Sequence, residues 1–143
     1  MRFMVMVRAN KDTEAGVMPS TEELAAMGKF NEEMVKAGIM LTGEGLHPSM
    51  RATRLKFSGG TPLVVNGPFP ANELVCGFWM LQAKSRDEVI DWMKRAPFGK
   101  GAELEIRQVF EAEDFGEELT PELRKQEERQ RAAIEKNRQR AGK

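Results

Sequence analysis

The chain has 143 residues, enough for one domain with a sizeable core but too few for two large domains. Its 22 basic and 22 acidic residues balance, so it lacks the basic excess typical of a dedicated nucleic-acid-binding protein. The single cysteine, Cys76, excludes a disulfide framework and a cysteine zinc cluster, and we interpret it as a small buried hydrophobe. The apolar run over residues 1–8 is too short for a membrane span or a signal peptide. We therefore expect a cytoplasmic protein without a membrane partner.

The first third of the chain predicts a strand, a helix and a second strand. Residues 2–8 alternate as a strand does, with apolar side chains on both faces. Ser20 and Glu23 form a capping box that opens a helix, and Gly38 suits the left-handed residue that ends it. Residues 39–42 start the second strand and lead into a loop. The predicted buried stripe of the helix comprises Leu24, Met27, Phe30, Met34 and Ala37.

The middle of the chain predicts a hairpin. Residues 52–57 and 62–65 read as short strands, and Ser58-Gly59-Gly60 forms the turn between them. The alternation places Leu55 and Phe57 inward, with the basic residues of the first strand facing outward.

The next part of the chain predicts a long strand, a helix and a last strand. Residues 75–83 form the long strand, which is apolar on both faces. Ser85 and Glu88 make a second capping box, and Pro97 ends the helix that follows. Residues 103–110 form the last strand, with three apolar side chains on one side: Leu104, Ile106 and Phe110.

The order β-α-β-β-β-β-α-β reduces, without the inner hairpin, to β-α-β-β-α-β, a ferredoxin-like antiparallel sheet. Two helices on one face leave the other face bare, although it carries apolar side chains near Met4, Met6, Phe78 and Met80. An exposed apolar face of this width is a liability on a monomer. A two-fold homodimer would bury it. The alternative is that a C-terminal helix covers this face.

That C-terminal helix is predicted from Thr120, which caps it, and Pro121 in its first position. From residue 122 to the end there are eight basic and four acidic residues, so the tail carries +4 and the rest of the chain −4. We interpret the tail as a solvated helix. A nucleic-acid-binding arm is the alternative, but acidic residues are interleaved and no aromatic residue could stack on bases. The predicted domains are therefore residues 1–118 and a charged extension, residues 119–143.

Two loop segments hold most of the residues that could do chemistry. The first contains the only histidine, His47, a residue type that titrates near neutral pH and can act as an acid or a base. Glu44 lies three residues earlier. The second segment is the turn Asn66-Gly67-Pro68-Phe69, in which we expect Gly67 to adopt a special backbone angle and Phe69 to pack or to line a cleft. Arg8, at the end of the first strand, could bind an anionic ligand.

The stretch from residue 38 to residue 79 resembles the YciI-like, or YCII-related, family, also called the DGPF-domain proteins. The matching segments are Gly43-Glu44-Gly45-Leu46-His47-Pro48-Ser49, Asn66-Gly67-Pro68-Phe69, Gly77-Phe78-Trp79 and the run from Ile106 to Gly116. The resemblance covers residues 1 to about 120. It implies a dimeric α+β barrel with a cleft between the sheet and the two loops. Some members have been proposed as enzymes that use a His/Asp pair, and some of their genes travel with sigma-factor genes.

The sequence departs from the family motif at Asn66, where the family has aspartate. An amide cannot ionise, so Asn66 could orient His47 by a hydrogen bond but could not serve as a base. The family also has a glutamate soon after the phenylalanine, and Glu73 is the residue that could correspond to it. Acid–base chemistry through the His47 and Asn66 pair is therefore put in doubt.

Two hypotheses follow from these residues. In the first, the protein is a cofactor-free enzyme on a small molecule, with His47 moving a proton while Asn66 and Glu44 position the substrate; Phe69, Glu73 and Arg8 would bind it. In the second, it is a non-catalytic module that senses a ligand or docks a partner, which the resemblance links to sigma-factor regulation. A metal site is a weaker third idea, because one histidine and Glu44 supply too few ligands. We expect no cofactor.

Overall fold

The structure is a computed structural model in which residues 1–142 are described. It forms two compact units, Met1–Val109 and the remainder from Phe110 onward, and each is described by itself. The predicted domain boundary after residue 118 stays a prediction, because compactness alone does not show which part folds independently. In the described part of the chain, no helix combines the length and the apolar character needed to cross a bilayer.

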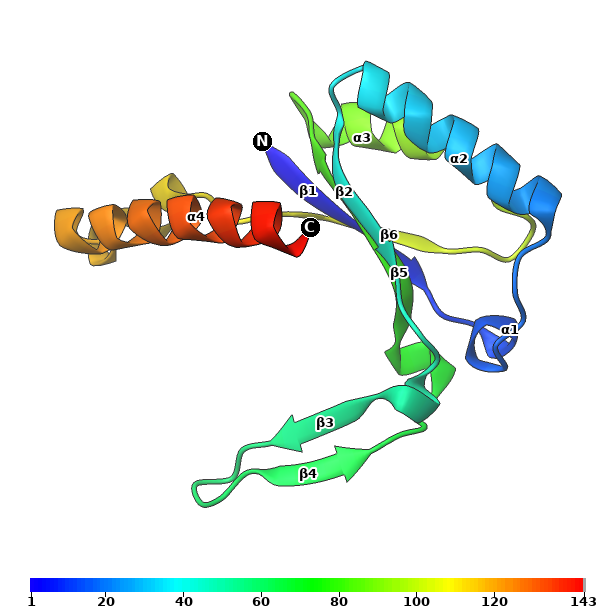
Figure 1. The fold of residues 1–143 in the computed structure, drawn as a ribbon, viewed down its shortest axis with the longest axis horizontal. Coiled ribbons are helices and arrows are strands. Elements are labelled where there is room, and N and C mark those ends of the chain that lie inside the picture. The colour runs from blue at the N-terminus through cyan, green and yellow to red at the C-terminus, as the bar shows by residue number, and fades with distance from the viewer. Residues whose placement is uncertain (143) are drawn as a thin grey trace. The chain divides into compact units, whose positions relative to one another are not determined.

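The first unit is built on a four-stranded antiparallel sheet (Figure 1). The strand order β2-β5-β1-β6 is the ferredoxin-like order, and the predicted α+β fold class is thereby confirmed. Two of the strands are shorter than predicted at their ends, and the second strand is longer. The bounds are β1 (Arg2–Arg8), β2 (Met40–Gly45), β5 (Val75–Gln82) and β6 (Leu104–Gln108).

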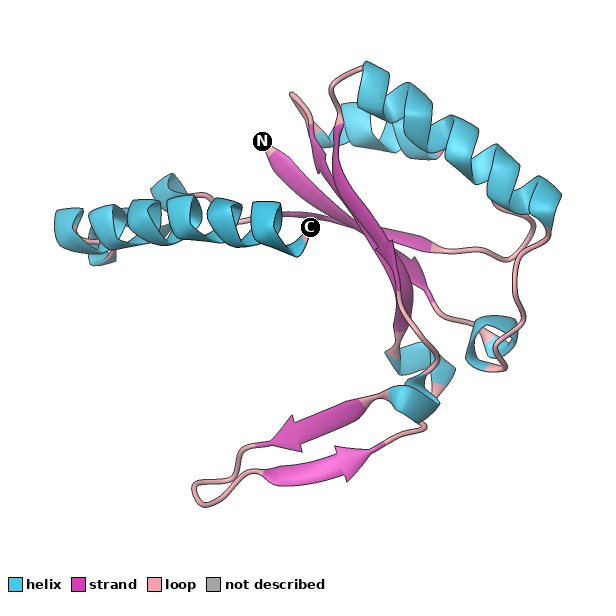
Figure 2. Cartoon of the chain, in the orientation of Figure 1, coloured by secondary structure: helices cyan, strands magenta, loops and turns pink. Residues whose placement is uncertain are grey.

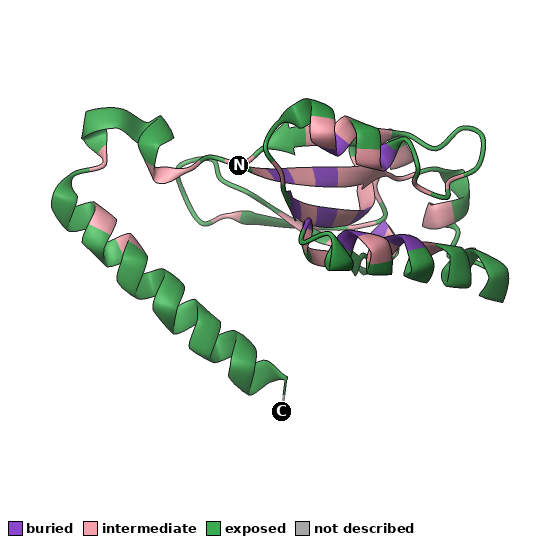
Figure 3. Cartoon of the chain, turned by 90° about the horizontal axis from the view of Figure 1, so that it is seen from above, coloured by how far each residue is buried: buried purple, intermediate pink, exposed green. Residues whose placement is uncertain are grey.

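Helices α2 (Thr21–Lys36) and α3 (Arg86–Met93) lie on one face of this sheet (Figure 1). Between them and the strands lies the core, which Figure 3 shows as a band of buried positions. Leu24 was predicted to be buried but is 58% exposed, because it lies in the first turn of α2, beyond the part of the helix that packs on the core. The core side chains are Phe3, Val5, Phe30, Met34, Ile39, Trp79, Leu81, Val89 and Met93.

The predicted helix ends agree with the structure in most details. The Ser20–Glu23 capping box is present, and Gly38 follows α2 with a positive φ of 75°. At α3, Ser85 accepts a hydrogen bond from the Glu88 N–H at 3.2 Å. The Glu88 carboxylate, however, accepts from the Lys84 N–H at 2.7 Å, so only half of the predicted second box forms.

The opposite face of the sheet, called here the open face, carries no helix of the first unit. Its side chains form rows across the strands. Met6 of β1 pairs with Phe78 of β5 and with Glu105 of β6, and Glu44 of β2 pairs with Phe78. This row therefore has an apolar centre and an acidic residue at each end. In the next row, Met4 lies between Met80 and Arg107 in the same way.

Strands β3 (Thr53–Lys56) and β4 (Leu63–Asn66) form a separate two-stranded ribbon, called here the arm (Figure 2). Leu55 lies opposite Val64, and Phe57 follows β3. The prediction that Leu55 and Phe57 point inward is wrong, since they are 55% and 79% exposed. The reason is that the arm has no second layer in this chain, so the apolar side of its alternation faces solvent.

The short helical segments between these elements were not predicted. They are α1 (Lys11–Glu14) and the 3₁₀ helices η1 (Ser49–Arg51), η2 (Ala71–Glu73) and η3 (Ala112–Glu118). The last strand ends at Gln108, and Phe110 instead belongs to the second unit, where its ring packs near Phe115 with centroids 5.2 Å apart.

The second unit ends in the predicted C-terminal helix, α4 (Pro121–Ala141). The Thr120 side chain accepts a hydrogen bond from the Leu123 N–H at 3.3 Å, and Pro121 occupies the first helical position. None of the described residues of α4 is buried within its own unit.

Candidate functional site

Three segments distant in sequence meet around the hydroxyl of Ser49, and we call this contact the Ser49 junction. Ser49 is 3% exposed and is the only buried polar residue among those described. The Glu14 carboxylate accepts hydrogen bonds from the Ser49 hydroxyl and from its N–H, the latter at 3.0 Å. The Phe69 N–H donates to the Ser49 Oγ at 2.9 Å. The junction thus ties α1, η1 and the Asn66–Phe69 turn together. Because the hydroxyl is buried and satisfied, we interpret it as structural.

Local sequence explains how Glu14 and Ser49 reach these positions. Asn10 caps α1, accepting from the Thr13 N–H at 2.9 Å, while the Asn10 N–H donates to the Thr13 hydroxyl at 2.8 Å. This reciprocal box fixes the single turn that ends in Glu14. Pro48 precedes η1 with an extended ψ of 156°, and the 3₁₀ turn that begins at Ser49 reverses the direction of the chain.

Gly67 is required at the junction because of close backbone approach. A Cβ on Gly67 would lie 1.8 Å from the carbonyl oxygen of Ser49. Its N–H donates to the carbonyl of Ala52 at 2.9 Å, and the Gly67–Pro68 peptide bond is cis. The special backbone angle expected at this pair is thus the cis peptide bond, and Gly67 itself does not have a positive φ. Glycine is required at this position because no other residue type could place a Cβ so close to the backbone of Ser49.

His47 lies outside the junction and is exposed. Its ring nitrogens Nδ1 and Nε2 lie 3.3 and 3.2 Å from Nη1 of Arg51, so the neighbour of the imidazole is a guanidinium. Asn66 is also exposed, and its Oδ1 accepts a hydrogen bond from the Thr53 hydroxyl at 2.9 Å. Within the described residues, the structure therefore does not join His47 to Asn66 by a hydrogen bond.

The other predicted site residues fall into two groups. Arg8 and Phe69 lie at the loop end of the sheet: Arg8 donates to the Asn72 carbonyl at 2.7 Å, and the guanidinium of Arg54 sits 3.8 Å from the Phe69 ring centroid. Glu73 is bound to the same arginine in a partly exposed ion pair of 3.7 Å. Glu44 instead lies on the open face, level with Phe78.

Cys76 occupies the corner between β5 and α1. Its Sγ lies 3.9 Å from the carbonyl oxygen of Arg8. Burial raises the pKa of the Cys76 thiol, and a hydrogen bond with Thr13 opposes this effect without cancelling it. A raised pKa keeps the thiol protonated, so this cysteine has the character of an unreactive, packed side chain.

Charge is distributed unevenly around the candidate site. Residues 45–72 contain no aspartate or glutamate, whereas Arg51, Arg54 and Lys56 all lie within them. The acidic residues that contact this stretch are Glu14, whose carboxylate accepts from the Ser49 N–H at 3.0 Å, and Glu73, which pairs with Arg54 at 3.7 Å. Among the described residues, no carboxylate is hydrogen-bonded to His47, which lies beside the guanidinium of Arg51 in a positively charged loop. Such a loop attracts an anionic group, but it offers no acid–base pair.

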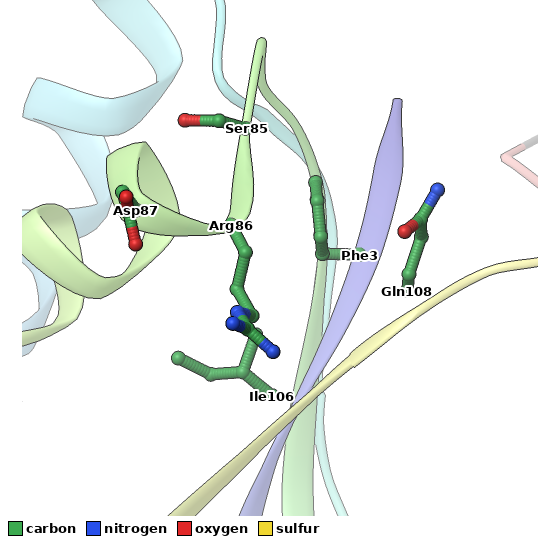
Figure 4. Close-up of a pocket in the computed structure, with 6 residues that line it drawn as sticks. All are labelled: Phe3, Ser85, Arg86, Asp87, Ile106 and Gln108. Carbon is green, nitrogen blue, oxygen red and sulfur yellow. The ribbon is translucent and has the colours of Figure 1, made fainter.

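A depression of about 310 Å³ lies elsewhere on the first unit. Figure 4 shows the residues that line it. It is at the edge of β6, whereas His47 follows β2 at the opposite edge of the sheet. It is also at the opposite end of the strands, because Phe3 pairs with Gln108 there. Its rim is largely exposed and holds no histidine or cysteine, so we place the candidate site at the loops and the open face. The lining residues are Phe3, Ser85, Arg86, Asp87, Ile106 and Gln108.

Among the described residues, no group of three or more histidine, cysteine, aspartate or glutamate side chains comes together in a way that could hold a metal ion. The pairing of His47 with Glu44 considered from the sequence therefore gains no third ligand. We identify no cofactor-binding arrangement in this part of the chain.

Comparison with known proteins places this arrangement in a family. Residues 1–113 match the family model of the YCII-related domain. The chain belongs to the YCII-related domain family. The resemblance inferred from the sequence is thus confirmed. A search of curated proteins finds no match.

Among solved structures, this YCII-related chain is similar to 5-chloro-2-hydroxyhydroquinone dehydrochlorinase (TftG) from Burkholderia phenoliruptrix AC1100, in complex with 2,5-dihydroxybenzoquinone. The two are 16% identical, with a TM-score of 0.39, and the match covers 78% of this chain and 96% of that chain.

Sequence reasoning missed three residues of this YCII-related site: Glu14, Ser49 and Arg51. Asn10 followed three residues later by Thr13 is a capping pattern that could have revealed α1. Ser49 was part of the matched motif, but its burial had no local signal. The contact with Glu14 spans 35 residues, and nothing in the sequence pairs the two.

Proposed function

We propose that this YCII-related protein is a homodimeric, non-catalytic module that binds a small molecule in a cleft between the open face and the His47 loop. The single observation that carries the proposal is the row formed by Glu44, Phe78, Met6 and Glu105, which is apolar at its centre and lies beside a positively charged loop. An apolar floor with a few polar groups at its edge is the usual composition of a small-molecule site.

The homodimer follows from the same surface. Met4, Met6, Phe78 and Met80 are only partly covered in the first unit, and they adjoin one another across β1 and β5. A contiguous apolar surface of this kind is normally covered in a stable protein. A two-fold pair covers both copies with one kind of contact. Each 100 Å² of apolar surface removed from water contributes about 2.5 kcal/mol before the costs of association.

The positions of the loop residues suggest the chemistry of the ligand. The Leu46 N–H donates to the Cys76 carbonyl at 2.9 Å, which holds the start of the His47 loop beside β5, two residues from Phe78. His47 and Arg51 then present nitrogen donors near the edge of the apolar row. These groups suit a small molecule with a flat apolar body and one anionic group, such as an aromatic carboxylate.

A binding role is favoured over acid–base catalysis by the partners of His47 and Asn66. A general base in a charge-separating reaction is usually oriented by an acidic residue. Here His47 faces Arg51, and the Asn66 oxygen is used by Thr53. Neither contact would stabilise an imidazolium. A link to sigma-factor regulation stays a prediction.

The second candidate is a cofactor-free enzyme, and one observation favours it. The His47 imidazole is exposed and engages no carboxylate among the described residues, so a substrate could reach it. In that case turnover would be abolished by His47→Ala and would rise with Asn66→Asp. Binding without turnover, in both the wild type and the Asn66→Asp variant, would favour the module.

Two measurements test the proposal: the mass of the protein in solution and its affinity for small molecules. Sedimentation at micromolar concentration should give the mass of two chains. Binding is measured by calorimetry with a panel of aromatic carboxylates, using 1-anilinonaphthalene-8-sulfonate as a fluorescent reporter of the apolar surface. We expect Arg51→Ala to weaken carboxylate binding about tenfold, the loss of one charge-assisted hydrogen bond at an exposed site.

Arg86→Ala is the matched control. Arg86 is likewise exposed, but it lies at the far end of the sheet beside the depression (Figure 4). It should leave carboxylate binding unchanged. An equal effect of the two substitutions would show non-specific attraction, and a wild type that binds no member of the panel would contradict the proposed ligand class.

A further inference from the structure

We infer that the arm of each protomer crosses to the second copy and packs its apolar side over the partner's open face, so that the ligand cleft has walls from both chains. This inference rests on the homodimer proposed above and adds which segment completes the site.

The arm lacks the packing that a two-stranded ribbon needs. A single hairpin is at best marginally stable in water, and a third strand or a packed layer is required for stability. In this chain the arm extends away from the four-stranded sheet (Figure 1). Its contacts with the body are at its root, where Gly67 meets Ser49 and Arg54 lies over the Phe69 ring. The outer part of the arm has no such layer.

The exposed side chains of the arm are apolar and share one side. Leu55 is directly opposite Val64, so the two point the same way, and Phe57 lies two residues beyond Leu55. They are 55%, 59% and 79% exposed. Three adjacent large apolar side chains with this exposure form a surface that another element should cover.

The open face of a second copy matches this surface in polarity. Its central row is apolar at Met6 and Phe78 and ends in Glu44 and Glu105. The basic residues Arg54 and Lys56 alternate with Leu55 and Phe57 and therefore lie on the other side of the ribbon, so the side that would face the partner is apolar. An apolar side of the ribbon against an apolar row removes both surfaces from water, and the charged residues at the ends of the row then lie at the rim of the contact, as in other protein interfaces.

Symmetry makes the contact large enough to be stable. In a two-fold pair each chain gives one arm and receives one. The exposed side chains of each arm represent on the order of 300 Å² of apolar surface, and two arms covering equal areas bury roughly 1,200 Å², which reaches the size of a stable interface. The root of each arm adjoins the His47 loop of its own chain, so the cleft would combine one chain's sheet with the other chain's arm.

The first test compares two valines of equal exposure. Val64 on the arm is 59% exposed, and Val35 on the outer side of α2 is 58% exposed. We expect Val64→Glu to raise the dimer dissociation constant at least tenfold in sedimentation across a dilution series, and Val35→Glu to leave it unchanged. Far-ultraviolet circular dichroism reports whether each variant is folded.

The outcomes separate this inference from the proposed function. A dimeric wild type whose affinity is unchanged by Val64→Glu would overturn the arm contact and leave the dimer standing. A monomeric wild type would overturn both. If Val64→Glu is unfolded, Val64→Thr takes its place, because threonine keeps the strand preference and nearly the same volume while adding a hydroxyl. It should still raise the dissociation constant severalfold, and no rise would overturn the arm contact.

The second test locates the arm. In a Cys76→Ser background, tagged Phe57→Cys chains are mixed with untagged Met6→Cys chains and treated with a short bismaleimide. We expect links between tagged and untagged chains, and none when Val35→Cys replaces Phe57→Cys. Equal linking from position 35, or no link from position 57, would overturn the placement. A link within one chain between Met6→Cys and Ile134→Cys, without any arm link, would assign the open face to α4 and also overturn it.

Discussion

The two faces of the four-stranded sheet carry similar side chains in very different surroundings. On one face, Val5 and Leu81 are fully buried beneath α2 and α3. On the other, Met6 and Phe78 are only partly covered, and no helix of the first unit lies over them. A sheet whose strands are apolar on both faces needs a packed layer on each face, and the first unit supplies a layer on one face only. The missing layer is the physical reason for expecting a second chain.

The charged residues mark the same difference. On the open face the apolar rows end in Glu44, Glu105 and Arg107, all exposed at the edge strands. On the covered face, β6 contributes the apolar Leu104 and Ile106 to the core instead. A face with an apolar centre and a charged rim has the composition of an interface, not of a domain core.

The largest expected effect comes from comparing neighbouring residues on opposite faces. Leu81→Ala should lower the free energy of unfolding by about 2–5 kcal/mol, because the removed side chain is fully buried and leaves a cavity. Met80→Ala should cost less than about 1 kcal/mol in the folded protomer while raising the dimer dissociation constant. Urea denaturation at a dilution where the protein is monomeric measures the first quantity, and sedimentation measures the second. Equal losses in unfolding free energy would mean that the two faces are equally covered within one chain.

The next effect tests the Ser49 junction through its glycine. Gly67→Ala should lower the unfolding free energy by about 1–3 kcal/mol, since the new methyl group would overlap the backbone of Ser49 and the segment must shift. Gly45→Ala is the matched control, because a Cβ there meets nothing within 4 Å and should change stability by less than about 0.5 kcal/mol. Thermal unfolding of both variants measures the difference, and a stable Gly67→Ala variant would show that the turn has room to adjust.

Removing the Ser49 hydroxyl tests the same junction by its hydrogen bonds. Ser49→Ala leaves the Glu14 carboxylate and the Phe69 N–H with fewer partners in a buried place, which should cost about 1–3 kcal/mol. Ser58→Ala, in the exposed turn of the arm, should be nearly neutral. Chemical denaturation compares the two serines. If Ser49→Ala were also neutral, the junction would not be what holds the loops together.

These residues also show what the sequence can and cannot predict. Ser20 and Gly38 are local signals that act within one turn of chain, and both behave as predicted. The prediction that Leu55 points inward was wrong. Alternation along a strand predicts which side chains share a face, but it does not predict whether another element covers that face. The pairing of Ser49 with Glu14 was invisible for a related reason: it depends on how the loops are brought together, and no spacing in the sequence encodes that.

A smaller effect, on the pH dependence of stability, is expected from Cys76, which lies on β5 close to α1. Burial raises the pKa of its thiol, so the folded protein keeps this proton to higher pH than the unfolded chain does. Stability should therefore fall slightly as the pH rises through the thiol pKa of the unfolded chain. Alkylation by iodoacetamide should reach half its maximal rate at a higher pH in the folded protein than in urea. The same midpoint in both states would contradict the burial of this thiol.

The smallest expected effect concerns α4, the other element that could have covered the open face. Ile134 is 54% exposed and is nearly the only large apolar residue of the helix beyond its first turn. If a second chain covers the open face, Ile134→Glu should leave the dimer dissociation constant unchanged and should change the free energy of unfolding by less than about 0.5 kcal/mol. Met6→Glu, which places the same charge in the middle of the open-face row, should weaken the dimer strongly. Should the two substitutions act alike in sedimentation, the covering layer would be this chain's own helix, and the contrast between the two faces would need no partner.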